Sequence, residues 1–248
     1  MPVIPSSPPP RRARGFTLLE TLLALALLGS LLAAAFALFG STVRETGDLN
    51  AANTLLVDGQ LAAQLLGARA QQACHVYPSG SAFDLGPGYS TEHPSGAGAT
   101  WTVGSDPFVA MILPPSGRGA TPERYRFAAA YLMPRAAYIA RAPYLANPGA
   151  DLFDDEQSVL LLLERPFPAV SPGTRCAALA AGPLAAAPAG DAAALALDHV
   201  RTAGATLAPD GRGVAFGWTL ERTVNGRAVR AGGAGGLRYF VAAANLGY

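Results

Sequence analysis

A single carboxylate, Glu20, lies near the start of a long apolar stretch. It is the only charged residue between Arg14 and Arg44. A charged side chain inside a membrane span costs a few kcal/mol, about 2.5–3.5 on insertion scales, which a plain anchor has no reason to carry. A carboxylate in such a place can pair with a cation on a neighbouring helix, because packing offsets the cost of both charges. Glu20 is therefore the first candidate for a functional residue.

Three interpretations fit the segment around Glu20. The residues from Thr21 to Val43 carry no charge and are enough for a helix to cross about 30 Å of hydrocarbon. The segment can be a secretory signal, with Ala35-Phe36-Ala37 as its cleavage site, or a plain signal anchor. The apolar run is longer than a signal core, and neither of these interpretations explains the carboxylate.

The third interpretation accounts for Glu20. The stretch Gly15-Phe16-Thr17-Leu18-Leu19-Glu20 closely resembles the class III signal of type IV pilins and type II secretion pseudopilins. The resemblance implies that prepilin peptidase cuts after Gly15 and N-methylates Phe16. Glycine suits such a cut, because it lets the scissile backbone fit closely into a protease. The resemblance also implies that Glu20 pairs with the amino terminus of a neighbouring subunit and sets the register of assembly.

The resemblance and the hydropathy pattern together divide the chain into four parts. These are a cleaved leader at 1–15, a transmembrane and assembly helix at 16–43, the amphipathic second half of the helix at 44–76, and an extracytoplasmic β-rich headgroup at 77–248. Three Arg residues precede the span, so the positive-inside rule predicts a single pass with the N-terminus in the cytoplasm. The fold class is α+β and pilin-like, a long N-terminal helix packed on an antiparallel sheet.

Apolar residues at three- and four-residue intervals predict that the helix continues through residues 44–73. A helix over residues 17–73 would be roughly 85 Å long. Glycine weakens helices, so kinks or fraying are expected at Gly47, Gly59 and Gly67. The face expected to pack on the sheet comprises Leu49, Ala52, Leu56, Gly59, Ala63, Leu66 and Ala70.

The remaining sequence predicts a loop and then short strands bounded by Pro, Gly or Asp. Residues 77–99 are expected to form a long loop, and residues 166–194, rich in Ala and Pro, to be irregular. Leu195–Arg201 is either a strand or a short helix, and Asn225-Gly226 is the strongest hairpin signal. The other predicted strands are Thr100–Val103, Phe108–Leu113, Tyr125–Leu132, Ala136–Ala140, Val159–Glu164, Val214–Val224, Arg227–Arg230 and Leu237–Ala243.

Cys74 and Cys176 are the only cysteines, and the compartment decides how they are interpreted. In an exported headgroup they are expected to form a disulfide that closes a long loop, whereas in a cytosolic protein they would be two unrelated thiols. His75 beside Cys74 raises the alternative of a metal site or an activated thiol. A disulfide cysteine next to an exposed histidine is the preferred interpretation.

No motif predicts catalysis, and no cofactor is expected. His75, His93 and His199 are scattered, and the sequence contains no HExxH, Cys-x-x-Cys, GxSxG or Walker pattern. All 18 basic residues are Arg, so Schiff-base chemistry and a phosphate-binding lysine are excluded. We therefore expect no catalytic residue and no metal centre, and the protein is not expected to be an enzyme.

Two clusters have a functional and a structural interpretation. The acidic cluster Asp151, Asp154, Asp155 and Glu156 could hold calcium, but it lacks EF-hand spacing and also fits a solvated helix start or turn. Arginines alternate with aromatics between residues 118 and 144, as in a platform for single-stranded nucleic acid or in an ordinary half-buried sheet with Arg outward. The set comprises Arg118, Arg124, Tyr125, Arg126, Phe127, Tyr131, Arg135, Tyr138, Arg141 and Tyr144. Without the leader, 15 Arg face 17 acidic residues, so net charge does not support DNA binding.

The predicted function is that of a minor type IV pilin-like subunit in a priming or tip role, in adhesion, motility or DNA uptake. The helix text LLVDGQLAAQLLGARAQQA and the later LALDHV resemble the larger minor pilins of the PilW/GspJ kind. The implied partners are other pilins, prepilin peptidase, the inner-membrane assembly platform and, before assembly, the cytoplasmic membrane. The implied final location is the periplasm or a cell-surface pilus. The alternatives are a type II secretion pseudopilin and a signal-anchored extracytoplasmic protein that binds another molecule such as DNA.

Overall fold

The computed structural model describes residues 17–96, 98–115, 124–167, 175–181, 193–211, 213–232 and 236–243. The chain forms two compact units, Met1–Gly47 and Asp48–Tyr248. The predicted leader and the predicted processing residues Gly15 and Phe16 lie outside the described residues, as does most of the region 166–194 that was expected to be irregular.

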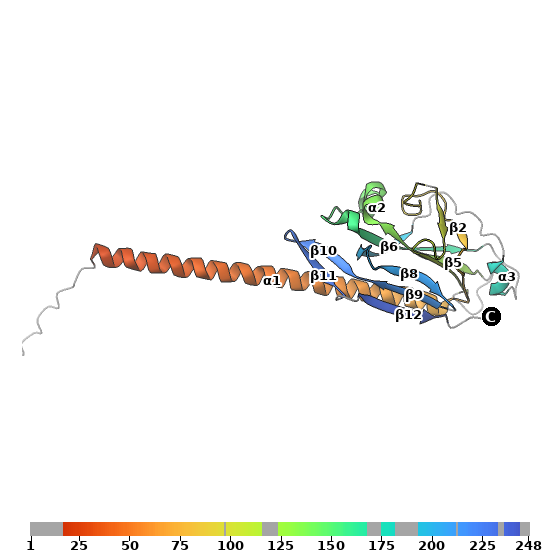
Figure 1. The fold of residues 1–248 in the computed structure, drawn as a ribbon, viewed down its shortest axis with the longest axis horizontal. Coiled ribbons are helices and arrows are strands. Elements are labelled where there is room, and N and C mark those ends of the chain that lie inside the picture. The colour runs from red at the N-terminus through yellow and green to blue at the C-terminus, as the bar shows by residue number, and fades with distance from the viewer. Residues whose placement is uncertain are drawn as a thin grey trace, which may run out of the picture. The chain divides into compact units, whose positions relative to one another are not determined.

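One helix, α1, runs from Leu18 to Gln72 and confirms the long N-terminal helix expected from the sequence (Figure 1). Helical structure continues through Gly47, Gly59 and Gly67, so the fraying expected there is absent. Serine and threonine hydroxyls in the apolar half donate to carbonyl oxygens three or four residues earlier, as Ser30 does to Leu27 at 2.8 Å. These polar groups therefore need no water, which suits an apolar surrounding.

The second unit is built on a seven-stranded antiparallel sheet in the order β1-β4-β5-β6-β7-β10-β11. An α+β fold of the expected pilin-like class is therefore present. Asn225 and Gly226, both at positive φ, join β10 to β11 as a tight hairpin turn requires. The strands are β1 (His75–Val76), β4 (Phe108–Leu113), β5 (Arg126–Pro134), β6 (Gln157–Pro166), β7 (Ala194–Arg201), β10 (Leu220–Val224) and β11 (Arg227–Ala231).

Two smaller sheets and several short helices complete this unit. One sheet has the order β12-β9-β8, and β2 pairs with β3 in a second one. Their strands are β2 (Ala82–Asp84), β3 (Thr100–Thr102), β8 (Thr206–Asp210), β9 (Gly213–Trp218) and β12 (Leu237–Ala242). The short helices are α2 (Arg135–Arg141), η1 (Tyr144–Ala146), η2 (Asp154–Glu156) and α3 (Cys176–Ala180).

One face of the main sheet packs on the second half of α1 and on the sheet formed by β8, β9 and β12, which lie beside the helix in Figure 1. Small helix residues allow this approach. A Cβ atom on Gly59 would lie 2.9 Å from Leu220 Cδ1, so the glycine that weakens the helix also lets the sheet come close. The buried helix residues are Leu55, Gly59, Ala62, Ala63, Leu66, Gly67 and Ala70.

The opposite face of the main sheet is covered by the β2–β3 hairpin and the loops around it. Trp101 of β3 packs against Tyr131 of β5, with ring centroids 4.6 Å apart, and against Phe108 of β4 at 6.0 Å. Because both faces are covered, all six residues of β4 are buried. Strands such as Phe108–Leu113 are therefore continuously apolar. In a sheet with one exposed face, apolar and polar residues would alternate along the strand.

Four local predictions are wrong. Ala136–Ala140 is part of helix α2, because Ala-rich sequence after Pro134 favours a helix start over a strand. Val214–Val224 is two strands in different sheets, β9 and β10, divided at Thr219. The loop 77–99 contains strand β2, and Leu49 at the start of the predicted packing face is 65% exposed.

Candidate functional site

The start of α1 is fixed by Thr17 and Glu20. Thr17 precedes the first helical residue. The backbone N–H of Glu20 donates to the Thr17 hydroxyl oxygen, with N and Oγ1 3.3 Å apart, and to the Thr17 carbonyl oxygen at 3.0 Å. This is the arrangement of a helix N-cap, with the acidic residue three positions later. The carboxylate therefore lies in the first turn, where the positive end of the helix dipole favours it. The spacing of Thr17 to Glu20 is that of an N-cap, although Thr17 is not among the residues singled out from the sequence.

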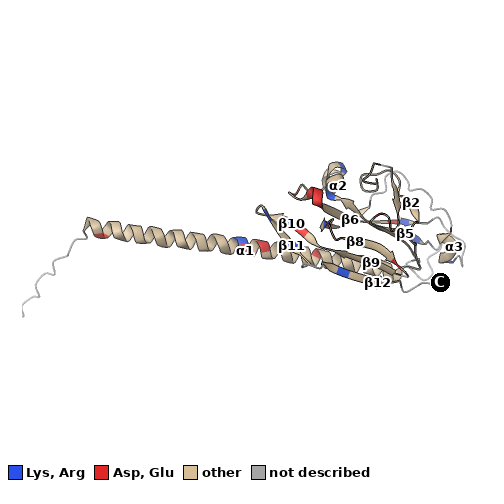
Figure 2. Ribbon diagram, in the orientation of Figure 1, with Lys and Arg blue, Asp and Glu red and all other residues tan. Residues whose placement is uncertain are grey.

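The helix surface beyond Glu20 is apolar and uncovered. None of the most hydrophobic 18-residue window is buried, and α1 is long and apolar enough to cross a membrane by length and composition. Leu19 is 77% exposed and Phe36 is 72% exposed, although both are large hydrophobic residues. Figure 2 shows no charged residue along α1 between the acid in its first turn and the charges at Arg44 and Glu45. A surface of this kind requires lipid or other apolar helices around it.

The two cysteines form a disulfide in the second unit. Cys74, directly after α1, is bonded to Cys176 at the start of α3, across a sequence separation of 102 residues. The pairing expected for an exported protein is therefore the one in the structure. His75 is half-buried rather than exposed, and its ring meets the edge of Tyr77 at a centroid distance of 4.9 Å. Burial lowers the pKa of His75, so this residue packs as a neutral ring.

The acidic residues predicted to form one cluster bind separate partners within the headgroup. Asp154 pairs with Arg135, while Asp151 accepts hydrogen bonds from the Thr223 hydroxyl at 2.5 Å and the Thr223 amide at 3.0 Å. Burial tends to raise the pKa of Asp151, but these hydrogen bonds lower it overall. Within the described ranges, no group of three or more His, Cys, Asp or Glu side chains is placed to hold a metal ion.

Arg135 is the centre of a buried charge cluster. It is 1% exposed, and its Nε and Nη2 atoms bind the two carboxylate oxygens of Asp198 at 2.7 and 3.0 Å. Its Nη2 atom also donates to the Gly149 carbonyl oxygen at 2.8 Å, and Nη1 contacts Asp154. This side chain therefore fastens the segment after β5 to strand β7.

A β-bulge in β7 brings Asp198 and His199 into this cluster. Ser158 pairs with Val200 and Leu160 with Leu197, so two residues of β7 oppose only Val159. His199 has a φ of 59°, which is uncommon outside glycine and belongs to the bulge. Burial lowers the pKa of His199, although Asp198 and Asp151 act in the opposite direction. Nothing in the spacing of the sequence indicates this bulge.

The arginine and aromatic residues between 118 and 144 do not form a nucleic-acid platform among the described residues. The rings of Phe127, Tyr131 and Tyr138 are buried, and Tyr131 donates to the Ser90 carbonyl oxygen at 2.8 Å. Arg135 is buried with its carboxylates, so the alternative of an ordinary half-buried sheet with Arg outward does not hold for this residue. Arg118 lies outside the described residues. Of the aromatic members, Tyr144 is the one that protrudes, at 93% exposure.

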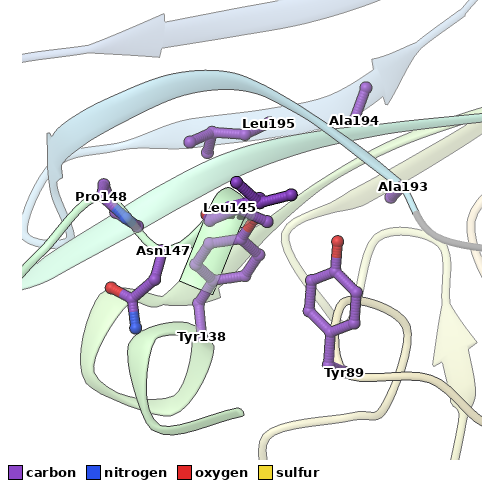
Figure 3. A pocket seen from close by; sticks show the side chains of 9 residues that line it. Tyr89, Tyr138, Leu145, Asn147, Pro148, Ala193, Ala194 and Leu195 are labelled. Atoms are coloured by element: carbon purple, nitrogen blue, oxygen red, sulfur yellow. Dashed lines mark hydrogen bonds between the residues drawn. The ribbon is translucent and has the colours of Figure 1, made fainter. Parts of the chain in front are cut away.

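A pocket of about 390 Å³ lies beside Tyr144, between helix η1 and the start of β7 (Figure 3). The rings of Tyr89 and Tyr138, 5.9 Å apart, line one side of it. Leu145 and Pro148 line another side, and Leu195 of β7 lies at its edge. None of the side chains that line this pocket is charged.

Residues 10–36 match the family model of the prokaryotic N-terminal methylation motif. The match covers the predicted cleavage site, Glu20 and most of the apolar run, and it supports a type IV pilin-family protein processed by prepilin peptidase. A motif of this kind implies membrane anchoring and assembly with other pilins. No curated protein and no solved structure matches the chain.

Proposed function

We propose that this chain, which carries the N-terminal methylation motif of the type IV pilin family, is a minor subunit that primes or caps a pilus or pseudopilus. Prepilin peptidase cuts it after Gly15 and methylates Phe16. The helix that remains holds the subunit first in the cytoplasmic membrane and then in the filament. The N-terminus faces the cytoplasm before assembly, and the headgroup is extracytoplasmic.

The observation that carries the proposal is the uncovered apolar half of α1 with one carboxylate in its first turn. Burial of one leucine side chain is worth about 1.5–3 kcal/mol relative to water, so once this helix leaves the lipid, its many exposed leucines must be covered by like helices. Apolar packing alone permits axial sliding. A Glu20 carboxylate paired with the methylated amino group of a neighbouring chain at Phe16 fixes one register, because any other register leaves both charges unpaired.

Assembly of this kind needs no catalytic residue and no cofactor, and we propose that the chain has neither. The priming or tip position rests on family-level analogy, because a headgroup of 174 residues after Cys74 is large for a repeated shaft subunit. The buried aromatic rings and the internally paired arginines of the headgroup do not favour DNA as its ligand.

Mass spectrometry of the N-terminus tests the proposal. The full chain is expressed in membranes with and without prepilin peptidase. With the peptidase, the mature chain is expected to begin at N-methylated Phe16. A Gly15→Leu variant is the matched control and is expected to keep the leader. A chain that retains Met1 with active peptidase present, or that begins after Ala37, would contradict the proposal.

A further inference from the structure

A rigid arm between β5 and β6 exposes apolar side chains on the headgroup. This segment, residues 135–156, comprises α2, η1 and η2 and is here called the β5–β6 arm. Leu145 is 97% exposed, Tyr144 93% and Leu152 73%. Side chains of this size are normally buried, and on a free surface each exposes area that a partner could cover.

The arm is held in place by many contacts, so its exposed tip is not a loose loop. Arg135 joins it to Asp198 of β7, and Asp151 accepts two hydrogen bonds from Thr223 of β10. Inside the arm, the Asn147 side chain donates to the Ile139 carbonyl oxygen at 2.9 Å and accepts from the Gly149 amide at 2.9 Å. A surface ordered before binding loses little conformational entropy on association.

The tip of the arm lies next to a pocket that can hold a side chain of a partner protein. The pocket of about 390 Å³ is lined by Leu145 from the arm, by Leu195 from β7 and by the rings of Tyr89 and Tyr138. Exposed apolar side chains next to an uncharged pocket, whose lining is polar and apolar in about equal parts, together form the kind of centre that protein interfaces use as their anchor. An aromatic or aliphatic side chain of a partner would fill the pocket, while Tyr144 and Leu152 would pack around it.

The charges around the arm restrict the partner. Arg135 is paired internally and Arg141 binds Glu92 at 3.0 Å, so these cations are already engaged. Asp155 and Glu156, which follow Leu152, are exposed and acidic. At Asp155 and Glu156, a nucleic acid or an anionic lipid surface would meet like charge, and two copies of the arm facing each other would oppose these acids. The complementary surface is therefore apolar with a basic rim.

We infer that the β5–β6 arm is the docking surface for the headgroup of a different pilin-family subunit in the same assembly. This inference rests on the proposed function, which places other pilin headgroups beside this one. Packing of the N-terminal helices brings the two headgroups together, and the arm then selects the neighbour through apolar contact with a basic rim.

Site-specific photo-crosslinking tests this inference in cells that make the whole assembly. Tyr144 of the full chain is replaced by p-benzoyl-phenylalanine, and the same replacement at the exposed Thr206 of β8 is the matched control. Illumination is expected to join position 144, and not position 206, to a different chain that carries its own N-terminal methylation motif. The crosslinked peptide is expected to lie in the headgroup of that chain. A Leu145→Ser change should lower the crosslink yield by about fivefold or more, as for an interface anchor.

The same sample is analysed for its N-terminus, which separates the two proposals. A chain that begins at N-methylated Phe16 but crosslinks at position 144 to its own copies, to lipid, to nucleic acid or to nothing overturns the docking surface and leaves the pilin assignment standing. An unprocessed chain instead refutes the proposed function. An intact Cys74–Cys176 bond on a non-reducing gel shows that the variants have folded.

Discussion

Replacing Arg135 by methionine should destabilise the headgroup more than any other single change of a charged residue discussed above. The side chain is 1% exposed and binds both oxygens of Asp198, the carbonyl oxygen of Gly149 and the carboxylate of Asp154. Methionine keeps the apolar stem and similar length but removes every donor. The change therefore isolates the loss of the charge partner from the loss of packing.

The magnitude follows from what the substitution leaves behind. Removal of one partner of a buried ion pair costs about 3–5 kcal/mol, because the remaining charge is buried without compensation. The side chains of Asp154 and Asp198 are 20% and 18% exposed, so water can reach them in part and the lower end of that range applies. For a domain of this size about 3 kcal/mol corresponds to a fall in Tm of roughly 6–12 °C.

Thermal unfolding of the full chain in detergent, followed by near-ultraviolet circular dichroism, measures the effect. Both Trp residues lie in the second unit, so this signal reports on the headgroup. Arg222→Met is the control, because Arg222 is exposed and has no ion pair in the described part of the chain. Equal Tm values for the two variants would refute the reasoning. So would a further loss of stability when Asp154→Asn and Asp198→Asn are added to Arg135→Met, since removing the unpaired carboxylates should recover part of it.

Four further predictions concern other parts of the molecule. Loss of the disulfide in a Cys74→Ala/Cys176→Ala chain should lower the free energy of unfolding by about 4–5 kcal/mol, since it closes a loop of 102 residues, and reductant should then have no further effect. Burial lowers the pKa of His199, so stability should decline as the pH falls from about 7.5 to about 5, and His199→Asn should make that decline smaller. Gly59→Val should cost about 1–3 kcal/mol by pushing against Leu220, whereas Ala68→Val on the exposed side of α1 should cost less, and equal Tm values would contradict close packing at Gly59. Glu20→Ala should leave N-terminal processing intact but abolish incorporation into filaments isolated by shearing, while the exposed Glu45→Ala should assemble normally.

Much of the fold could be predicted from the sequence where the signal is local. The extent of α1 follows from a long stretch without proline in which apolar residues recur at helical spacing, and the hairpin at Asn225-Gly226 follows from two residues that accept positive φ. Strand β4 coincides with the predicted Phe108–Leu113, because a continuous apolar run of this length, bounded by turn residues, is long enough for a buried strand and short for a helix. In the candidate site, Glu20 could be identified from the sequence, because a single charge in an apolar run is recognised without knowledge of any tertiary contact.

Other features depend on contacts between distant residues and could not be predicted. Ala136–Ala140 is too short to show a periodicity, and the place where its helix is held on the sheet is set by Arg135 reaching Asp198 on a strand 63 residues later. That contact requires the bulge in β7, and a bulge leaves no mark in composition or spacing. Gly59 was interpreted as a weakness of the helix because its packing partner, Leu220, lies far away in the chain.

The sequence by itself determined a helix long and apolar enough to span a membrane, the N-terminal methylation motif and the single carboxylate in the apolar run, because hydropathy and short-range motifs act along the chain. Only the tertiary structure decided which residues form the headgroup surface. The arginines and aromatics that suggested a binding platform are mostly buried, since both faces of the main sheet are covered. The uncharged arm tip at Tyr144 and Leu145 is exposed instead, because the buried Arg135 cluster fixes its base on the sheet while no described element covers its tip.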